Sequence, residues 1–492
     1  MATPAPSGSS VRDSDAVTLH ADLTHEVDEG PAGPQIGAFF DVDRTLLAGF
    51  SVITFVRHGV AAGTISPAEL ARTVLSATLF QLGQIGFSSF VTGAAGMLRN
   101  HSEAEAEEMA ERVFEEALAA DVYPESRALV QAHRRKGHTV ALVSSATRYQ
   151  IEPLARDLGI PHILCTELEV REGRFSGEVR RPTCYGEGKA RAVRELAATH
   201  GIELEQSYFY TDSDEDLPLL EIVGNPRPTN ANASLSRIAA RRRWPVRHFS
   251  SRGTPGVLDV LRTSLAIGSL LPTVFLGAEA GLLDASWRRF ANLVIATWGE
   301  VGTALAGVDL RVSGEEHLWS ARPAVFIFNH QSAIDMLLLA KMLRRDIVGV
   351  AKQEVKRNPI FGPLFSLAGT VFIDRFNHRA ALAALKPAVD ALRSGLSLVM
   401  APEGTRSVTP KLGRFKKGAF HLAMAAGVPI VPIVFRNALD ALPKHGVIVR
   451  PSTVEAVIHP PIPTTGWHPD ELEARIAEIH RLYRETLGEE SS

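Results

Sequence analysis

Short apolar runs recur along this chain, and several of them stop at polar residues that can carry chemistry. Such runs of three to six residues, bounded by polar or turn residues, predict buried strands. In the first half they lie at residues 36–40, 140–143 and 208–210, and in the second half at residues 324–328, 369–373, 398–401 and 428–433. The chemistry of each half is therefore expected at the ends of its strands.

The run at residues 324–328 is followed by Asn329 and His330, and a predicted helix begins near Asp335. This arrangement places an imidazole at a sheet edge with a carboxylate behind it. Such a pair can take the proton of a substrate hydroxyl, because the carboxylate fixes the tautomer and stabilises the imidazolium. The dyad implies acyl transfer to an alcohol. For the pair alone, a strand-end histidine and a helix-capping aspartate are an equally good interpretation.

Two further strands of the second half deliver arginines. Arg375 follows the run at residues 369–373, and Arg406 lies in a glycine-containing turn after residues 398–401. Guanidinium groups at adjacent strand ends suit a phosphate dianion, since each offers a rigid bidentate fork. The run at residues 428–433 then supplies an apolar wall.

With these four blocks in order from Asn329 to Pro432, the chain resembles the glycerolipid acyltransferases, specifically the 1-acylglycerol-3-phosphate (lysophosphatidic acid) acyltransferases. The resemblance implies that His330 is the general base and Asp335 its partner. It also implies that the glycerol phosphate of the acceptor is held by Arg375, Glu403, Gly404, Thr405 and Arg406. Ala401 replaces the family's usual aromatic residue, which leaves the acyl-chain preference open. No serine or cysteine nucleophile motif is present here, which favours direct attack on an acyl thioester.

In the first half, the strand at residues 36–40 ends in Asp41 and Asp43, which fall on the same side of an extended chain. The first carboxylate can attack phosphorus, and the second can protonate the leaving alcohol and then activate water. A third strand runs into the acidic cluster at residues 212–216. Such a cluster needs a cation, and Mg²⁺ is the hard, small candidate. For Asp41 and Asp43 alone, a loop with Asx-turns is the simpler alternative.

The order of these motifs resembles the haloacid dehalogenase superfamily phosphatases over roughly residues 35–250, in the branch that includes the phosphoserine phosphatases. The resemblance implies that Asp41 is nucleophile and metal ligand, and that Asp43 is acid/base and a ligand through its carbonyl. It further implies that Ser144 and Lys189 bind the phosphoryl group. Asp212 would complete the metal site, and Asp216 would support that site from behind. Thr211 stands where the family usually has glycine.

A helical insert at about residues 46–121 is expected to form a cap on this domain. No acidic residue follows Thr45 until Glu69, which weakens the case for an amino-acid phosphate, and no charged residue lies between Arg72 and Arg99. An apolar cap suits a lipid phosphate, although packing within the cap explains the pattern equally well.

Composition adds limits. A length of 492 residues predicts more than one domain, and the net charge of −3 excludes a globally basic nucleic-acid binder. Cys165 and Cys184 cannot make a disulfide framework and are expected to be reduced.

Residues 1–35 are polar and expected to be disordered, without signal-peptide features. Apolar segments at residues 263–278 and 290–310 predict a helical hairpin that lies in one membrane leaflet.

These patterns together predict two α/β domains. We expect a disordered segment at residues 1–35, a doubly wound, Rossmann-like phosphatase domain at 36–250, a membrane-associating hairpin at 251–310 and an acyltransferase domain at 311–492. The chain is expected to make phosphatidic acid from lysophosphatidic acid, with acyl-CoA or acyl carrier protein as donor, and to hydrolyse a phosphomonoester with Mg²⁺. The expected location is the cytoplasmic face of the membrane, peripheral or monotopic. The alternatives are another lysophospholipid as acceptor, and a first half that acts on a soluble ester such as phosphoserine or only regulates.

Overall fold

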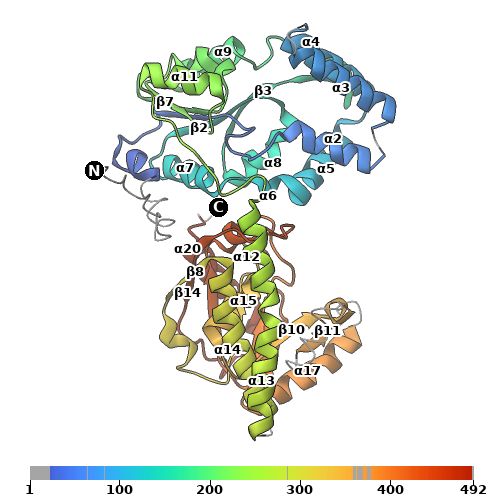
Figure 1. The fold of residues 1–492 in the computed structure, drawn as a ribbon, viewed down its shortest axis with the longest axis vertical. Helices are drawn as coiled ribbons and strands as arrows, with labels where there is room; N and C mark the ends of the chain where they lie inside the picture. Colours follow the sequence, from blue (N-terminus) through green and yellow to red (C-terminus); the bar gives the residue numbers. More distant parts are fainter. Residues whose placement is uncertain are drawn as a thin grey trace, which may run out of the picture. The chain divides into compact units, whose positions relative to one another are not determined.

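The computed structural model describes residues 23–63, 65–81, 84–284, 286–357, 362, 370–373 and 378–489. The chain divides into two compact units, Met1–Thr254 and Pro255–Ser492, which Figure 1 shows in blue to green and in green to red.

The first unit is built on a five-stranded parallel sheet with the order β3-β2-β1-β6-β7. Its strands are β1 (Gly37–Phe40), β2 (Thr139–Thr147), β3 (His162–Thr166), β6 (Tyr208–Thr211) and β7 (Asn225–Pro228). One face packs on α7 (Pro124–Arg135) and α8 (Arg148–Leu158). The other packs on α9 (Glu187–His200) and α11 (Ala233–Arg242). The predicted doubly wound fold is confirmed, and its carboxyl strand ends share one edge.

Helices inserted between β1 and α7 form the cap. They are α2 (Ser51–Ala61), α3 (Pro67–Gln81), α4 (Phe87–Met97), α5 (Glu103–Val113), a π-helical turn (Phe114–Leu118) and α6 (Ala119–Asp121). A second, two-stranded element, β4 (Leu168–Arg171) with β5 (Arg174–Val179), packs against α4. The cap thus leaves after β1 and returns beside the same loop, where the Ala48 amide donates to the Asp121 carbonyl at 2.9 Å, before the chain enters α7.

The prediction of disorder through residue 35 is wrong for the described part of that segment. Residues 23–29 form a helix, and Val27 is completely buried in the core beside β1. Glu26 of this helix is paired with Arg227 and Arg247. The apolar content was too low to predict a helix, but one buried valine and one carboxylate between two arginines suffice to dock it. Residues 1–22 lie outside the described residues.

Under this N-terminal segment, three hydrogen bonds link two buried histidines, and the directions of these bonds follow if both rings are neutral. His138 Nε2 lies 2.9 Å from the Pro31 carbonyl, which can only accept, so this nitrogen carries the hydrogen. His138 Nδ1 therefore accepts from His133 Nδ1 at 2.8 Å. His133 Nε2 in turn accepts from the Tyr210 hydroxyl at 3.0 Å. Because the Tyr210 hydroxyl can also accept, it is burial of the rings that disfavours an added proton.

We expect acid to destabilise the first unit through this pair. Burial lowers the pKa of His133 well below its usual 6.5, and burial also lowers the pKa of His138. The folded unit therefore binds fewer protons than the unfolded chain, so stability falls as pH drops below the unfolded pKa of 6.5. Through His133 alone, the free energy of unfolding of the first unit should be lower by about 1 kcal/mol at pH near 5.5. The urea midpoint of the first unit should fall accordingly between pH 7.5 and 5.5. A midpoint that stays constant, or a His133→Gln variant with the same pH dependence, contradicts this account.

The second unit begins with three helices, α12 (Val257–Gly268), α13 (Leu270–Asp284) and α14 (Trp287–Ala306). The first two form one long apolar helix over Val257–Glu279, and α14 packs against both. Two arms joined by a turn were predicted, and both are present. Residues 308–310, however, belong to strand β8 and not to the second arm, because they pair in parallel with β14.

A seven-stranded sheet follows with the order β11-β10-β12-β9-β13-β14-β8. Its strands are β8 (Val308–Ser313), β9 (Val325–Phe328), β10 (Ile347–Lys352), β11 (Val371–Ile373), β12 (Ser397–Met400), β13 (Ile430–Phe435) and β14 (Ser452–Ile458). Only the β13–β14 pair is antiparallel among the described pairs. The core on one face includes α14 and α15 (Asp335–Leu343). The other face packs on α17 (His378–Arg393), α18 (Gly418–Ala426) and α20 (Leu472–Leu487).

Candidate active sites

The first candidate site lies at the carboxyl edge of the sheet in the first unit. Asp41 directly follows β1, and its amide donates to the Tyr210 carbonyl at 2.9 Å, which continues the pairing with β6. Its side chain is buried. Ser144 lies at the same edge, because β2 pairs in parallel with β1 with Leu142 opposite Phe40. The buried Ser144 hydroxyl accepts from the Ala146 amide at 3.2 Å.

Lys189, in the first turn of α9, connects two carboxylates of this site. Its ammonium donates to Asp41 Oδ1 at 2.9 Å and to Asp216 Oδ2 at 2.8 Å, and all three side chains are nearly or fully buried. Burial of Asp41, together with the charges of Asp216 and Asp212, raises the pKa of the Asp41 carboxyl, and Lys189 opposes that rise. Lys189 itself stays charged, since the two carboxylates outweigh its burial and raise its pKa.

Thr211, which stands where the family usually has glycine, uses its side chain to hold Asp216. Its hydroxyl donates to Asp216 Oδ2 at 2.6 Å, and Ser213 N lies 3.3 Å from the same hydroxyl. Asp216 therefore accepts from Thr211 and from Lys189 with one oxygen. A family pattern that expects glycine at this position does not predict a contact made by the Thr211 side chain.

Asp43 lies two residues beyond Asp41, at the start of the cap. Its Oδ1 accepts from the Ser51 amide at 2.8 Å, in the first turn of α2. Burial raises the pKa of Asp43, although the bond to Ser51 opposes the rise. A raised pKa suits a carboxyl group that must hold a proton before it donates one.

Asp212 completes the edge and pairs with Arg44 at 3.2 Å. Arg44 has a φ of 58°, in the left-handed region, and its carbonyl accepts from Asn230 at 3.0 Å. Burial raises the pKa of Asp212 to about 6, with Asp216 adding to the rise and Arg44 opposing it. A cation near Asp41 and Asp212 would favour the ionised form of both.

The donor set fits Mg²⁺ better than a softer metal. Within the described residues no group of three or more His, Cys, Asp or Glu side chains is placed to hold a metal ion. Two carboxylates, Asp41 and Asp212, remain at the edge, with the Asp43 carbonyl as a further oxygen. Mg²⁺ commonly takes few protein oxygens and completes its shell with water and substrate phosphate. Asp216, predicted at the metal site, has its Oδ2 engaged by Lys189 and Thr211.

The second candidate site lies at the carboxyl end of β9. His330 Nδ1 is 2.9 Å from Asp335 Oδ2, which also accepts from the amides of Gln331 and Ser332 at 2.9 Å each. Asp335 is fully buried, and burial raises its pKa while His330 and the two amides oppose the rise. An ionised Asp335 makes Nδ1 the donor, so Nε2 carries the free lone pair. The predicted dyad is thus brought together.

Glu403 anchors the loop after β12 to the end of β9. Its Oε1 accepts from the His330 amide at 2.8 Å, and its Oε2 accepts from Ser407 Oγ at 3.0 Å and from the Gly413 amide at 2.8 Å. The Ser407 amide donates to the His330 carbonyl at 2.8 Å. Both carboxylate oxygens are therefore used by the chain itself. A Cβ at Gly413 would lie 2.6 Å from Glu403 Oε2, so this position needs glycine.

Gly404, Thr405 and Arg406 form the tip of that loop. Gly404 has a φ of 77°, which a side chain would strain. Thr405 is exposed, and Arg406 is half-buried with no ion-pair partner among the described residues. Its guanidinium is thus available to an anionic ligand in the described part of the site.

Arg375 lies outside the described residues, but the strand before it is described. The two arginines were predicted at adjacent strand ends, and this is wrong: β10 lies between β11 and β12. The order of the motifs in the sequence suggested that β11 and β12 are neighbours, whereas β10 pairs with both of them. The strand beside β9 on this side is β12, which leads to Arg406.

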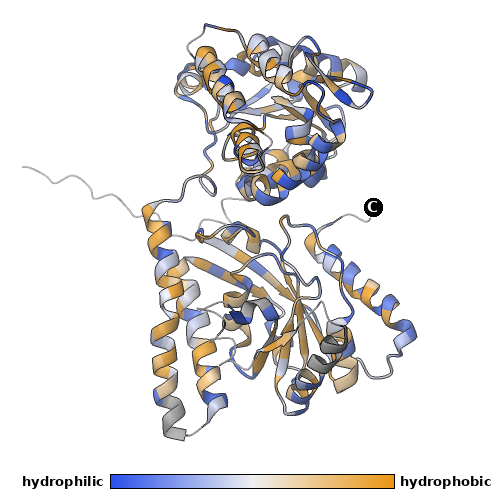
Figure 2. Cartoon of the chain, turned by 90° about the vertical axis from the view of Figure 1, so that its right-hand side faces the viewer, coloured by the Kyte–Doolittle hydropathy of each residue, from blue (hydrophilic) through white to orange (hydrophobic). Residues whose placement is uncertain are grey.

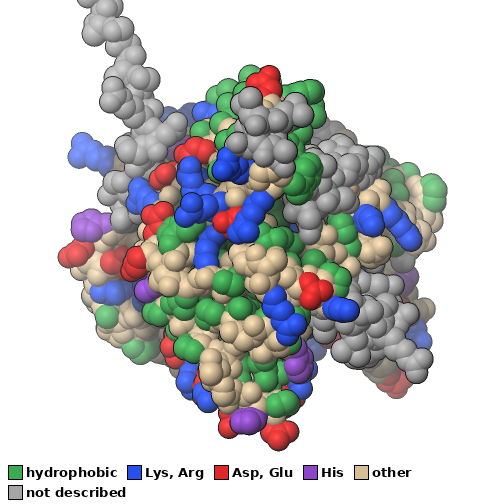
Figure 3. Space-filling model, turned by 90° about the horizontal axis from the view of Figure 1, so that it is seen from below, with side chains coloured by type: hydrophobic (Ala, Val, Ile, Leu, Met, Phe, Trp, Pro, Cys, Tyr) green, Lys and Arg blue, Asp and Glu red, His purple; other side chains and the backbone are tan. Residues whose placement is uncertain are grey.

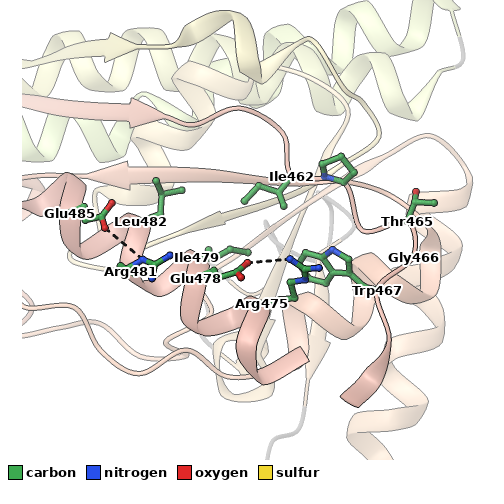
Figure 4. Close-up of a pocket in the computed structure, with 11 residues that line it drawn as sticks. Ile462, Thr465, Gly466, Trp467, Arg475, Glu478, Ile479, Arg481, Leu482 and Glu485 are labelled. Atoms are coloured by element: carbon green, nitrogen blue, oxygen red, sulfur yellow. Dashed lines mark hydrogen bonds and ion pairs between the residues drawn. The ribbon is translucent and has the colours of Figure 1, made fainter. Parts of the chain in front are cut away.

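In the second unit, a surface cavity of about 550 Å³ lies between α20 and the loop at residues 462–467. Its two arginines at positions 475 and 481 lie 3.3 Å from Glu478 and 3.7 Å from Glu485 (Figure 4). None of the predicted site residues lines it. We assign it no role in the chemistry.

Comparison with known families separates the two units. The haloacid dehalogenase-like hydrolase family matches residues 38–221, and the acyltransferase family matches residues 309–436. A probable phosphatase of Mycobacterium tuberculosis is 34% identical over 43% of this chain and 75% of its own length. A 1-acyl-sn-glycerol-3-phosphate acyltransferase of Limnanthes alba is 37% identical over 40% of this chain and 70% of its own length. The crystal structure of a 1-acyl-sn-glycerophosphate acyltransferase of Thermotoga maritima is 24% identical, with a TM-score of 0.42 over 48% of this chain and 97% of that one.

Proposed function

Since the chain belongs to the haloacid dehalogenase-like hydrolases through its first unit and to the 1-acylglycerol-3-phosphate acyltransferases through its second, we propose that it is a bifunctional enzyme of phospholipid synthesis. The second unit transfers an acyl group from a thioester to the free hydroxyl of lysophosphatidic acid. The first unit hydrolyses a phosphomonoester. The observation that carries the first of these activities is the His330–Asp335 pair at the end of β9.

In the acyl transfer, His330 Nε2 takes the proton of the acceptor hydroxyl while Nδ1 donates to Asp335. The alkoxide oxygen attacks the thioester carbonyl, the carbon–sulfur bond breaks, and the imidazolium returns the proton to the thiolate. Asp335 keeps the ring in one tautomer and stabilises its positive charge. Glu403 holds the His330 backbone, and thereby the ring, in place. The donor is acyl-CoA or acyl carrier protein, as expected for this family.

Arg406 is proposed to bind the phosphate of the acceptor, together with Arg375. We expect Arg406→Ala to raise the acceptor concentration for half-maximal rate by about tenfold or more, because a charge-assisted bond to phosphate is lost. Steady-state kinetics with lysophosphatidic acid as the varied substrate measure this. Arg481→Ala, which removes an exposed arginine on α20, serves as the matched control. An Arg406→Ala enzyme with an unchanged acceptor dependence contradicts the assignment.

In the first unit, an Asp41 oxygen is proposed to attack phosphorus, which breaks the ester P–O bond and forms an aspartyl phosphate. Asp43 gives its proton to the leaving alkoxide, then takes one from the water that releases phosphate. Lys189 and Ser144 hold phosphoryl oxygens. Asp216 and Thr211 fix the Lys189 ammonium. Bound Mg²⁺, held by Asp41, Asp212 and the Asp43 carbonyl, would stabilise negative charge on the phosphoryl group.

The substrate of the first unit is proposed to be a lipid phosphate, either phosphatidic acid or lysophosphatidic acid. The product of the second unit is itself a phosphomonoester of the kind that the first unit is built to cleave. The cap supports this choice, since α3 and α4 carry no charged residue from Thr73 to Leu98. The chain would then set how much of the acylated product keeps its phosphate.

The second unit is proposed to bind the cytoplasmic face of the membrane through α12 and α13. This helix exposes large apolar side chains to solvent, among them Val257 at 88%, Phe275 at 72% and Leu271 at 66%. Figure 2 shows it orange along most of its length. Seen from below, the surface carries hydrophobic side chains interspersed with lysines, arginines and carboxylates (Figure 3). Apolar insertion combined with basic side chains is typical of interfacial anchors.

This attachment should resist high salt and yield to detergent. Insertion of apolar side chains is insensitive to ionic strength, whereas purely electrostatic binding is screened. Fractionation of lysed cells should therefore leave the chain with the membranes after a salt wash and release it with detergent. Recovery in the soluble fraction after simple lysis contradicts the anchor. Protease access to one terminus from the outer face would instead show a span.

A further inference from the structure

The helices α2 and α3 of the cap expose apolar stripes where surface helices usually expose charge. On α3 the exposed positions Ala71, Val74, Leu75 and Thr78 follow the spacing i, i+3, i+4, i+7, which is one helical face. Val74 and Leu75 are 57% and 60% exposed. An ordinary surface helix directs this kind of stripe toward the core. Here it points to solvent.

The helix α2 also exposes apolar side chains. Phe50, Ile53, Arg57 and Val60 are exposed at helical spacing, with Phe50 at 48% and Ile53 at 53%. This helix begins at Ser51, whose amide binds the Asp43 carboxylate. The apolar surface thus starts next to the acid/base residue of the phosphatase site.

The exposed side chains of α3 take no part in the packing of α3 on α4. Aromatic rings connect α3 with α4, since the half-buried Phe80 stacks on Phe90 at 5.6 Å between centroids. Phe87 stacks on Tyr185 at 4.2 Å, in the loop that leads to Lys189. These rings are half-buried where α3, α4 and the Tyr185 loop meet, whereas Val74 and Leu75 take no part in these ring contacts and are exposed.

Charge on the cap is divided between two regions. From Arg44 to Ser102 the sequence has one carboxylate, Glu69, against the arginines at 57, 72 and 99 in α2–α4 and their connections. By contrast, α5 carries five glutamates in eleven residues. A surface of apolar side chains edged by arginines and nearly free of carboxylates is complementary to an anionic bilayer.

We propose that α2 and α3 form a second membrane-contacting surface, which lays the phosphatase site against a bilayer containing anionic lipid. This deepens the proposed function and rests on it, because a phosphatase acting on a bilayer lipid must reach a headgroup at the interface. Phe50, Ile53, Val74 and Leu75 enter the acyl boundary, while Arg57 and Arg72 meet lipid phosphates. The acidic α5 stays in water.

Hydrogen–deuterium exchange of the full chain tests this surface. In vesicles of phosphatidylcholine with phosphatidylglycerol, exchange should slow in Ser51–Ala61 and Pro67–Gln81 but not in Glu103–Val113. The α12–α13 segment serves as the internal reference for membrane binding. Unchanged exchange in α2 and α3 while α12 and α13 are protected overturns the proposal. Protection that appears without vesicles as protein concentration rises also overturns it, in favour of self-association.

A matched pair of variants links the surface to activity. Leu75→Glu places a charge on the apolar stripe, whereas Ala104→Glu adds the same charge at an exposed position of the acidic α5. Leu75→Glu should lower phosphate release from vesicle-borne phosphatidic acid about tenfold, because a leucine that inserts into the bilayer is replaced by a charge. Hydrolysis of soluble p-nitrophenyl phosphate should stay unchanged in both variants. Equal rates for Leu75→Glu and wild type on vesicles contradict the proposal.

The outcomes separate this surface from the lipid-phosphate function. If the wild-type chain hydrolyses the soluble ester but no vesicle-borne lipid phosphate, the proposed substrate is wrong. Protection of α2 and α3 by vesicles would then still support the membrane surface. If vesicle lipid is hydrolysed without protection of α2 and α3, the substrate stands and the surface is wrong.

Discussion

Asp41→Asn is expected to abolish phosphate release, with a loss on the order of 1,000-fold or more, while the chain remains folded. The amide keeps the volume of the carboxylate but removes the negative charge and most of the nucleophilicity of the attacking oxygen. The Lys189 ammonium, which now contacts Asp41 and Asp216, keeps one carboxylate partner. Inorganic phosphate released from phosphatidic acid, lysophosphatidic acid and a soluble ester measures the effect.

Asp214→Asn is the matched control for this variant. Asp214 belongs to the same acidic cluster, but its carboxylate binds Asn232 at 2.8 Å and not the buried Lys189. The same chemical change there should leave phosphate release within about twofold of wild type, as for surface substitutions. An active Asp41→Asn enzyme removes the aspartyl-phosphate mechanism. Equal losses in both variants would mean that the cluster acts only through its total charge.

His330→Ala is expected to lower acyl transfer by at least about 100-fold, because an unactivated alcohol loses its general base. Phosphate release by the first unit should not change, since the two sites lie in different units. Transfer of a labelled acyl group from a thioester to lysophosphatidic acid measures the effect. The independent phosphatase rate shows that the variant protein is folded and correctly quantified.

His421→Ala controls for the loss of a histidine in the same unit, because His421 is exposed on α18. Its acyl transfer should match that of wild type. Near-normal transfer by folded His330→Ala would remove the dyad from the mechanism. A fall in both activities of His330→Ala would point to damage of the fold.

Local spacing alone predicted those site residues whose neighbours are close in the chain, whereas Ser144, Lys189 and Asp212 were assigned only through the family resemblance. His330 and Asp335 are separated by one strand-to-helix turn, and Asp41 and Asp43 by one residue. Local geometry fixes such pairs before any tertiary structure is known. Hydrogen bonds between segments far apart in the chain could not be predicted from local geometry. Glu403 binds an amide 73 positions away at His330, and Lys189 reaches Asp41 across 148 positions.

Two errors have the same physical origin. The order of strands in a sheet depends on crossover connections, so β10 came between two strands that the sequence suggested were neighbours. The N-terminal helix at residues 23–29 is held by Arg227 and Arg247, which arrive from the far end of the first unit. In both cases the deciding contacts lie outside the sequence window that set the expectation.

The most direct measurement follows all lipid products of the purified full chain, supplied with vesicle-borne lysophosphatidic acid, an acyl thioester and Mg²⁺. Mass spectrometry should show phosphatidic acid forming first, followed by a dephosphorylated lipid and an equal amount of inorganic phosphate. The Asp41→Asn chain should accumulate phosphatidic acid, and the His330→Ala chain should form none. If phosphatidic acid and lysophosphatidic acid both keep their phosphate in the wild-type reaction, while a soluble phosphate ester is hydrolysed by the same protein, action of the two units on a shared lipid is contradicted.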